Sequence, residues 1–136
     1  MPFVLDASVA LAWLLADEAN DYSERVLDRL NREEVIAPAI WPMEVANVLV
    51  LAERRGRLSP EQVSEALEEA LSLPIIVYGT APDQVLNPIS GLARRHGLSV
   101  YDATYLELAI REELPLATLD NSLREAAQRA GVPLIE

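Results

Sequence analysis

The sequence predicts an α/β protein with a mostly parallel, short-stranded sheet flanked by helices on both faces. Two observations lead to this fold class: short β-branched segments recur along the chain, and segments with helical periodicity fill the intervals between them. Strands that alternate with helices pair in parallel through right-handed crossovers, which place helices on both faces of the sheet. The length of 136 residues predicts a single domain over 1–136, large enough to bury a core without disulfides.

The strands are predicted from short runs of Val, Ile and Leu that are bounded by residues favouring turns. The first run, Phe3-Val4-Leu5, leads directly into an aspartate. The five predicted strands are residues 3–6, 35–37, 75–78, 116–119 and 133–135.

Three helices are predicted in the first half of the chain. Residues 8–16 are apolar nearly all round, which indicates a buried helix. Residues 21–32 carry an apolar stripe with charges on the opposite face, as expected for a helix at the surface. Residues 43–55 continue the helical pattern and end in Arg-Arg-Gly, which is typical of a helix terminus.

The second half contains further helices with clear start and stop signals. Ser59 is followed by a proline and then by a glutamine three residues on, which predicts a capped helix to about Leu71. Residues 82–96 have a helical pattern that Asn87-Pro88 interrupts, so the helix either kinks there or restarts with Asn87 as its cap. The last two predicted helices, 101–113 and 121–130, are stopped by Pro115 and Gly131.

The composition limits the possible locations and chemistries. There is no cysteine, so disulfides and thiolate metal sites are excluded. No apolar run approaches the ~20 residues of a membrane span, and the N-terminus lacks the pattern of a signal peptide. We therefore expect a cytoplasmic protein with no membrane partner.

The chain is strongly acidic, with a formal net charge of −11, and all eleven of its basic residues are arginine. An acidic chain lacks the usual electrostatic footprint of a nucleic-acid-binding protein. That objection weakens if several of the negative charges line a pocket filled by metal ions, because bound ions reverse the local field. Arginine is also well suited to bidentate contacts with phosphate.

Four acidic residues lie in otherwise apolar stretches, where an unpaired carboxylate is costly. Most other acids share their segment with arginines, which indicates a solvated face. The four have no such local partner, and each stands at the end of a predicted strand or in the first turn of a predicted helix. They are Asp6, Glu44, Asp102 and Asp120.

Strand C-termini and the N-termini of the following helices lie at one edge of a parallel sheet, where ligands collect. The four carboxylates are therefore expected to converge there. Ligands with oxygen only favour Mg²⁺ or Mn²⁺ over zinc or copper. Up to four negative charges suit two divalent ions, which together clamp the attacking and leaving oxygens of a phosphoryl displacement. No histidine base is needed, and the single histidine, His96, is interpreted as a partner of a helix C-terminus.

Each acid also has a structural alternative when it is taken alone. Asp6 and Asp120 are both suited to cap the helix that follows them. Asp102 and Glu44 are both suited to the first turn of a helix, where a negative charge complements the helix dipole. The joint placement of all four is harder to explain by four independent caps.

The chain resembles the PIN-domain nucleases, and among them the VapC-type toxins of toxin–antitoxin pairs. The resemblance covers nearly the whole chain. Its most specific segment is Leu98-Ser99-Val100-Tyr101-Asp102-Ala103-Thr104-Tyr105. It also rests on Val4-Leu5-Asp6-Ala7-Ser8, on Glu44-Val45-Ala46-Asn47-Val48-Leu49 and on Leu116-Ala117-Thr118-Leu119-Asp120.

The resemblance implies roles for particular residues. The acidic quartet of the family corresponds to Asp6, Glu44, Asp102 and Asp120. Ser8 and Thr118 fall on hydroxyl positions that the family keeps near the metals. Asn47 lies one turn after Glu44, where the family often has asparagine, although a local helix hydrogen bond explains it equally well. Asn121 stands where some relatives carry a further acid.

The resemblance implies a Mg²⁺- or Mn²⁺-dependent endoribonuclease toxin that cleaves structured RNA by two-metal hydrolysis. It also implies a homodimer that a cognate antitoxin neutralises. Two alternatives remain open: a catalytically silent PIN-like interaction module, and a PIN nuclease of RNA or DNA processing without an antitoxin. A neighbouring small reading frame with a DNA-binding N-terminus would favour the toxin.

Overall fold

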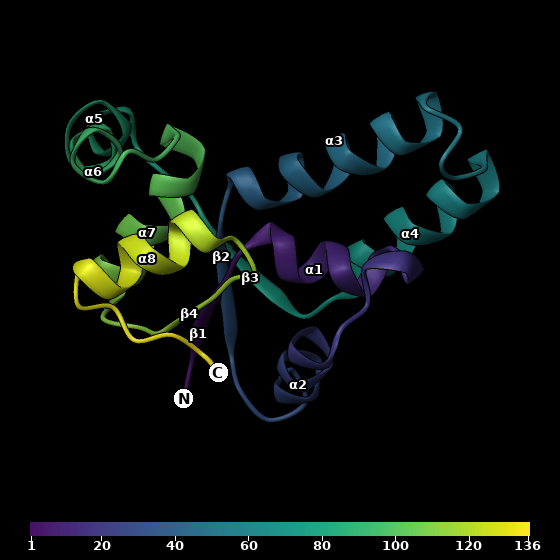
Figure 1. The fold of residues 1–136 in the computed structure, drawn as a ribbon, viewed down its shortest axis with the longest axis horizontal. Helices are drawn as coiled ribbons and strands as arrows, with labels where there is room; N and C mark the ends of the chain where they lie inside the picture. Colours follow the sequence, from purple (N-terminus) through teal and green to yellow (C-terminus); the bar gives the residue numbers. More distant parts are fainter.

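The computed structural model describes residues 1–136, and at its centre is a four-stranded sheet in which all neighbouring strands are parallel. The strand order is β3-β2-β1-β4. Figure 1 shows the sheet between two groups of helices, with the N- and C-termini near one another. The strands are β1 (Phe3–Leu5), β2 (Val35–Pro38), β3 (Ile75–Tyr78) and β4 (Leu116–Ala117).

Helices cover both faces of this sheet, which confirms the predicted fold class. In Figure 1, α7 and α8 lie on one side of the strands, and α1 and α4 lie on the other. The pair α3 and α4 extends away from the sheet as an arm. The helices are α1 (Ala7–Leu14), α2 (Asp21–Arg29), α3 (Ile40–Arg54), α4 (Pro60–Ser72), α5 (Pro82–Gln84), α6 (Ser90–His96), α7 (Val100–Glu112) and α8 (Asn121–Arg129), with a 3₁₀ turn η1 (Ala16–Glu18) and a π-helical turn η2 (Val85–Ile89).

The direction in which successive strands are added to the sheet reverses between β1 and β4, which are parallel. From β1 the chain moves outward to β2 and then to β3, but β4 returns to the opposite side of β1. In open parallel sheets, such a reversal opens a crevice beyond the carboxyl ends of the two strands that flank it. The turns that leave β1 and β4 are therefore the part of this fold best placed to bind a ligand.

Two strand predictions are corrected by the structure. Residues 133–135 do not form a strand, because only a single bridge joins Leu134 to Leu116. The fourth strand ends at Ala117 instead of continuing to residue 119. The physical reason is a tertiary contact: the N–H of Leu119 donates to the Ser8 hydroxyl at 3.0 Å, outside any strand ladder.

The third helix begins earlier than predicted, at Ile40 instead of residue 43. Pro42 is tolerated because it lies in the first turn, where a backbone N–H has no partner inside the helix. Glu44 therefore lies beyond the first turn of α3. The interpretation of Glu44 as a dipole partner in a first turn is accordingly wrong.

Pro88 interrupts the helical segment 82–96 without ending it. The chain passes from α5 through the π-helical turn η2, which contains Pro88, and continues as α6. Asn87 does not start a new helix as a cap. Of the two alternatives drawn from the sequence, the distorted continuous helix is the one observed, as expected where proline removes a donor.

The hydrophobic core forms around the first strand. Phe3, Val4 and Leu5 are completely buried and belong to a cluster of 28 buried residues that includes members of both helix layers. Burial on this scale fixes the position of β1 and of the residue that follows it. No helix is both long enough and apolar enough to cross a membrane.

Candidate metal centre at the carboxyl edge of the sheet

Two of the four predicted acids lie in the turns that follow β1 and β4, the two strands between which the strand order reverses. Asp6 follows β1 directly, and Asp120 follows β4 by three residues at the start of α8. The strands themselves are in register, since Leu5 pairs with Ala117. The two turns therefore lie side by side at the centre of Figure 1, although more than a hundred residues separate them in the sequence.

Asp6 is almost completely buried, with 4% of its surface exposed. It occupies the position before α1, but its side chain does not cap that helix. Instead its Oδ2 atom accepts hydrogen bonds from the hydroxyls of Ser8 and Thr118, both at 2.7 Å. Its other oxygen, Oδ1, has no hydrogen-bond partner. The alternative that Asp6 is a helix cap is thus not what the structure shows.

Backbone N–H groups orient the two hydroxyls toward Asp6. The N–H of Leu119 donates to Ser8 Oγ at 3.0 Å, and the N–H of Asp120 donates to Thr118 Oγ1 at 3.0 Å. Each hydroxyl oxygen accepts a hydrogen bond from the backbone, and its O–H group donates a hydrogen bond to the carboxylate. The β4–α8 turn thereby fixes the orientation of a side chain that follows β1.

Glu44 reaches the same region from α3. Its Oε1 atom accepts a hydrogen bond from the hydroxyl of Tyr105 at 2.6 Å, and its Oε2 atom has no hydrogen-bond partner. Tyr105 is fully buried on α7, three residues after Asp102. The sequence pattern predicted no role for Tyr105. The available signal was its spacing of three from Asp102, which places both residues on one helix face.

Asp102 stands in the first turn of α7, and Asp120 directly precedes α8 as its N-cap. Ser99 caps α7 by accepting the N–H of Asp102 at 3.0 Å, so Asp102 lies in a capped first turn. Asp120 itself caps α8, since its Oδ1 accepts the N–H of Leu123 at 2.9 Å. The structural alternative for Asp120 is therefore observed. It does not compete with a role in ligand binding, because Oδ2 is not used by the cap.

Burial and mutual repulsion raise the pKa values of three of the acids. Burial raises the pKa of Asp6 to about 6, while the Ser8 and Thr118 hydroxyls lower it, and the charges of Asp102 and Glu44 raise it further. Burial also raises the pKa of Glu44, which the Tyr105 hydrogen bond lowers and the charge of Asp102 raises. The pKa of Asp102 is raised by burial first and then by the charge of Asp120.

These interactions join all four carboxylates into one electrostatic group. Asp102 interacts with each of the other three, so it is the electrostatic centre of the group. No three acidic side chains come together closely enough to enclose one ion in this structure. The donor set itself, carboxylate and hydroxyl oxygen only, fits Mg²⁺ or Mn²⁺.

The predicted supporting residues divide into two kinds. Ser8 and Thr118 both contact Asp6 directly. Asn47, by contrast, is exposed on α3, and its side chain makes no hydrogen bond to an acid or to its own helix. His96 is the last residue of α6, as expected, with Gly97 in a left-handed conformation after it.

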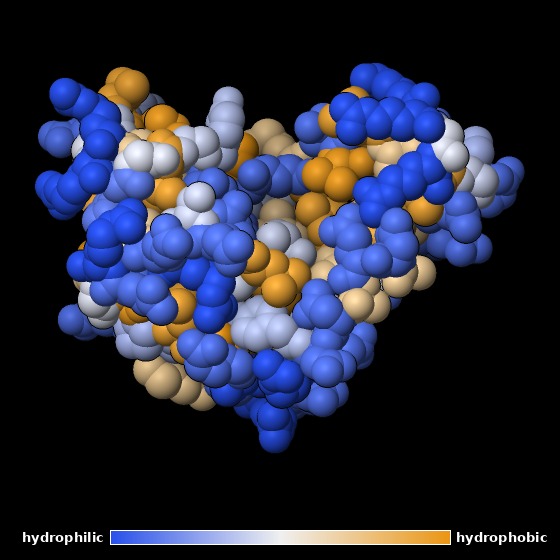
Figure 2. Space-filling view, viewed as in Figure 1, coloured by the Kyte–Doolittle hydropathy of each residue, from blue (hydrophilic) through white to orange (hydrophobic).

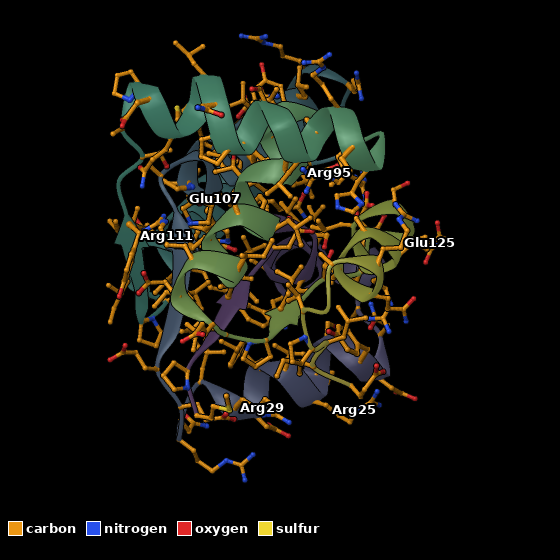
Figure 3. The ribbon with its side chains drawn as sticks, turned by 90° about the vertical axis from the view of Figure 1, so that its left-hand side faces the viewer. Arg25, Arg29, Arg95, Glu107, Arg111 and Glu125 are labelled. Atoms are coloured by element: carbon orange, nitrogen blue, oxygen red, sulfur yellow. The ribbon has the colours of Figure 1, made fainter.

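One further acid is buried, but it is neutralised locally. Glu107 on α7 is 6% exposed and pairs with Arg111 one turn later at 2.9 Å. Figure 3 shows Glu107 and Arg111 together on α7. A buried carboxylate that is paired with an arginine has no need of a metal ion to balance its charge. This contrast sets Glu107 apart from the four acids at the edge of the sheet.

An apolar hollow of about 270 Å³ lies between the start of α3 and the start of α7. Its lining includes Met43 and Tyr101, which are the sequence neighbours of Glu44 and Asp102. Figure 2 shows that the outline of the molecule is notched between the α3–α4 side and the α5–α6 side, with hydrophobic residues along the notch. The acidic group therefore has an apolar surface next to it.

Comparisons with known proteins agree with this description. A family model described as PIN domain matches residues 3–129. Ribonuclease VapC3 of Pyrobaculum aerophilum is 34% identical over 125 residues, which cover 92% of this chain and 94% of that protein.

Solved structures share the fold at lower sequence identity. The structure of VapBC2 from Rickettsia felis, bound to a DNA fragment from its promoter, aligns with a TM-score of 0.71 and 14% identity, covering 99% of this chain and 98% of the other. A toxin–antitoxin complex from Klebsiella pneumoniae aligns with a TM-score of 0.60 and 19% identity, covering 87% and 86% of the two chains. At these identities the likeness establishes the fold alone.

Proposed function

The chain belongs to the PIN-domain family, and from this premise we propose that its four edge carboxylates are the metal-binding, catalytic centre of a ribonuclease toxin. The ribonuclease activity is inferred from the relative named Ribonuclease VapC3, and the pairing with an antitoxin is inferred from the toxin–antitoxin complexes that share the fold. The proposed site residues are Asp6, Glu44, Asp102 and Asp120, supported by Ser8, Asn47 and Thr118. We treat residues 1–136 as a single PIN domain.

One observation carries the proposal: Asp6 is buried and held by two oriented hydroxyls, yet keeps one oxygen free. A buried carboxylate without a cationic partner is costly. Helix capping does not account for it, because Asp6 makes no cap bond. A divalent cation bound by the free oxygens would offset that cost.

The residues fit a pair of hard divalent ions. Asp6, Asp102 and Asp120 would hold Mg²⁺ or Mn²⁺ together with Glu44, since all four carry oxygen ligands and are electrostatically coupled. When bound, such ions supply the charge that activates water and stabilises the leaving oxygen in phosphodiester hydrolysis.

The side chains of the chain itself perform the remaining tasks. Ser8 and Thr118 hold Asp6 in its ionised form, because they donate hydrogen bonds to a carboxylate oxygen. Tyr105 does the same for Glu44. The caps of α7 and α8 fix the starts of the helices that carry Asp102 and Asp120. The site is thus preorganised by hydrogen bonds on every element that contributes to it.

The proposed reaction is hydrolysis of the bond between phosphorus and the 3′-oxygen of structured RNA such as tRNA or rRNA. The oxygen of water bonds to phosphorus, and the 3′-oxygen leaves and takes up a proton. Products therefore carry a 5′-phosphate and a 3′-hydroxyl. Metal ions bound at the edge would offset, at that place, the acidic net charge of −11 that otherwise repels RNA.

The proposed partners are a cognate antitoxin and a second copy of the chain. The antitoxin would place a basic side chain among the four carboxylates, where a cation is favoured. This mode of inhibition uses the same charge that binds the metal, so an occupied site would exclude both metal and RNA.

The decisive experiment is to incubate purified, antitoxin-free protein with total RNA and to map the ends of the fragments. We expect cleavage with Mg²⁺ or Mn²⁺ and none with EDTA, with 5′-phosphate ends. Cleavage that persists undiminished in EDTA would contradict the proposal. DNA cleavage without RNA cleavage would favour a nuclease of DNA processing.

A test in cells separates the toxin from a silent interaction module. Expression of the wild type alone is expected to arrest growth, and co-expression of the neighbouring antitoxin is expected to relieve the arrest. Asp6→Asn is the matched control, because the amide preserves shape and loses charge. If wild type and Asp6→Asn are equally harmless, the silent module is the better reading.

A further inference from the structure

Two of the four carboxylates, Asp6 and Glu44, which we call the inner acids, share one pattern of hydrogen bonding. Asp6 has both donors on Oδ2 and none on Oδ1. Glu44 has its donor on Oε1 and none on Oε2. Each side chain thus offers a single oxygen to a ligand, while hydroxyl groups occupy the other. For Glu44 the occupying group is the hydroxyl of Tyr105.

Tyr105 is held firmly enough to impose this choice of oxygen. Its side chain is 0% exposed, and its hydrogen bond to Glu44 is 2.6 Å long. A length of ~2.5–2.7 Å is typical of a hydroxyl that donates to a charged carboxylate. Tyr105 also shares a helix face with Asp102, so one rigid helix carries an acid of the site and orients a second.

Resting on the proposed function, we propose that Tyr105 is a positioning residue that makes Glu44 bind metal through one oxygen, so that the site favours Mg²⁺ and Mn²⁺ over Ca²⁺. The small ions require a nearly octahedral set of single oxygens. Ca²⁺ accepts six to eight oxygens and often takes both from one carboxylate. An oxygen already bonded to Tyr105 is less available for such two-oxygen binding.

The test is metal binding to the whole chain without RNA, which does not depend on catalysis. Isothermal titration calorimetry measures the dissociation constants of Mn²⁺ and Ca²⁺ for the wild type and for Tyr105→Phe, which keeps the buried ring. Losing a hydrogen bond that orients a ligand typically weakens metal binding by about 10–100-fold. In Tyr105→Phe we expect the binding of Mn²⁺ to weaken by about tenfold. The binding of Ca²⁺ should weaken less or become tighter, so the preference for Mn²⁺ falls.

Tyr22→Phe is the matched control. It removes a tyrosine hydroxyl that donates to the carbonyl of Ile135 at 2.8 Å, away from the four acids. We expect its Mn²⁺-to-Ca²⁺ preference to equal that of the wild type. If Tyr105→Phe weakens the binding of both ions equally, the ratio is unchanged, the hydroxyl only supports the structure, and the proposal is overturned. No change in the binding of either ion would overturn it equally.

A wild type that binds neither ion would instead overturn the proposed metal centre, which separates the two failures. A crystal structure of the wild type with Mn²⁺ gives an independent reading if Tyr105→Phe does not fold. The expected result is one Glu44 oxygen on the ion and the other within hydrogen-bond distance of Tyr105. Two Glu44 oxygens on the ion would overturn the proposal.

Discussion

The inner and outer halves of the acidic centre are built differently. The inner acids, Asp6 and Glu44, each accept a hydrogen bond from a distant hydroxyl, Thr118 for Asp6 and Tyr105 for Glu44, and Asp6 also accepts one from its neighbour Ser8. The outer acids, Asp102 and Asp120, lie in helix starts that are stabilised by local caps. The inner half therefore depends on tertiary structure, and the outer half on secondary structure. Substitutions in the two halves should consequently fail in different ways.

The largest expected effect is the loss of RNA cleavage in Asp6→Asn. The amide retains an oxygen that can accept from Ser8 and Thr118, so the fold should persist while the charge that attracts metal is lost. We expect activity to fall by more than about a hundredfold, and Glu44→Gln to add little to it, because residues that act as a unit are not additive. The measurement is cleavage rate with saturating Mn²⁺, beside circular dichroism. Full activity in a folded Asp6→Asn protein would remove Asp6 from the site.

The next effect concerns Thr118, whose hydroxyl donates to Asp6. Thr118→Val preserves shape, and we expect activity to fall by about 10–100-fold. Because the hydroxyl lowers the pKa of Asp6, its removal should also move the acidic limb of the pH–rate profile to higher pH. Thr104→Val is the control, since its hydroxyl bonds only to the carbonyl of Val100 in its own helix. An acidic limb that stays in place in Thr118→Val would show that Asp6 does not limit the rate.

A stability effect should run in the opposite direction to activity. The pKa of Asp6 is raised from 3.8 to about 6, so its protonated form stabilises the fold at low pH, and this stability is lost as pH rises through about 6. At pH 7 without metal, the ionised group costs about 3 kcal/mol. Asp6→Asn should therefore melt several degrees higher than the wild type in EDTA at pH 7.

Metal should close most of this gap in stability between the two proteins. Mn²⁺ at a hundredfold excess over its dissociation constant adds ~2.7 kcal/mol to the wild type, and Asp6→Asn should gain much less. Thermal melting of both proteins with EDTA and with Mn²⁺ gives the result. A metal-free mutant that is less stable than the metal-free wild type, with the same response to Mn²⁺, would indicate a purely structural Asp6.

The smallest expected effect separates the two roles of Asp120. Asp120→Ala removes the cap on the N–H of Leu123 and should cost about 1 kcal/mol of stability, whereas Asp120→Asn keeps a capping oxygen and should cost little. Both lose the charge, so both should cleave RNA more slowly. Urea denaturation and cleavage assays measure the two properties. Equal stability in the two variants would mean that the cap contributes nothing measurable.

The sequence was informative where local patterns determine structure. The α/β class and the parallel sheet are confirmed, and the third strand has the predicted bounds, because alternation of strands and helices is a local signal. The start of α3 was misplaced because Pro42 is tolerated in the first turn of a helix, and the end of β4 was misplaced because a tertiary contact decides it. The Ser8 hydroxyl accepts a hydrogen bond from the N–H of Leu119, so β4 ends earlier than predicted.

The assignment of the four acids to one site stays a prediction, and its limits have a physical origin. The positions of Asp6, Asp102 and Asp120 after strands or at helix starts follow from the sequence pattern. The pairing of Tyr105 with Glu44 spans 61 residues and joins two helices, so no local pattern reports it. Glu44 also lies deeper in α3 than expected, because Ile40 rather than residue 43 begins the helix.

The dependence of Asp6 on Thr118 has a consequence for protein synthesis. The two residues are 112 positions apart, and β1 has β4 as one of its two neighbours. A ribosome must therefore make most of the chain before Asp6 can receive its second hydroxyl. An unfinished chain, or one truncated before β4, lacks the arrangement proposed to cleave RNA. The order of residues along the chain thus delays the harmful activity until the protein is nearly complete.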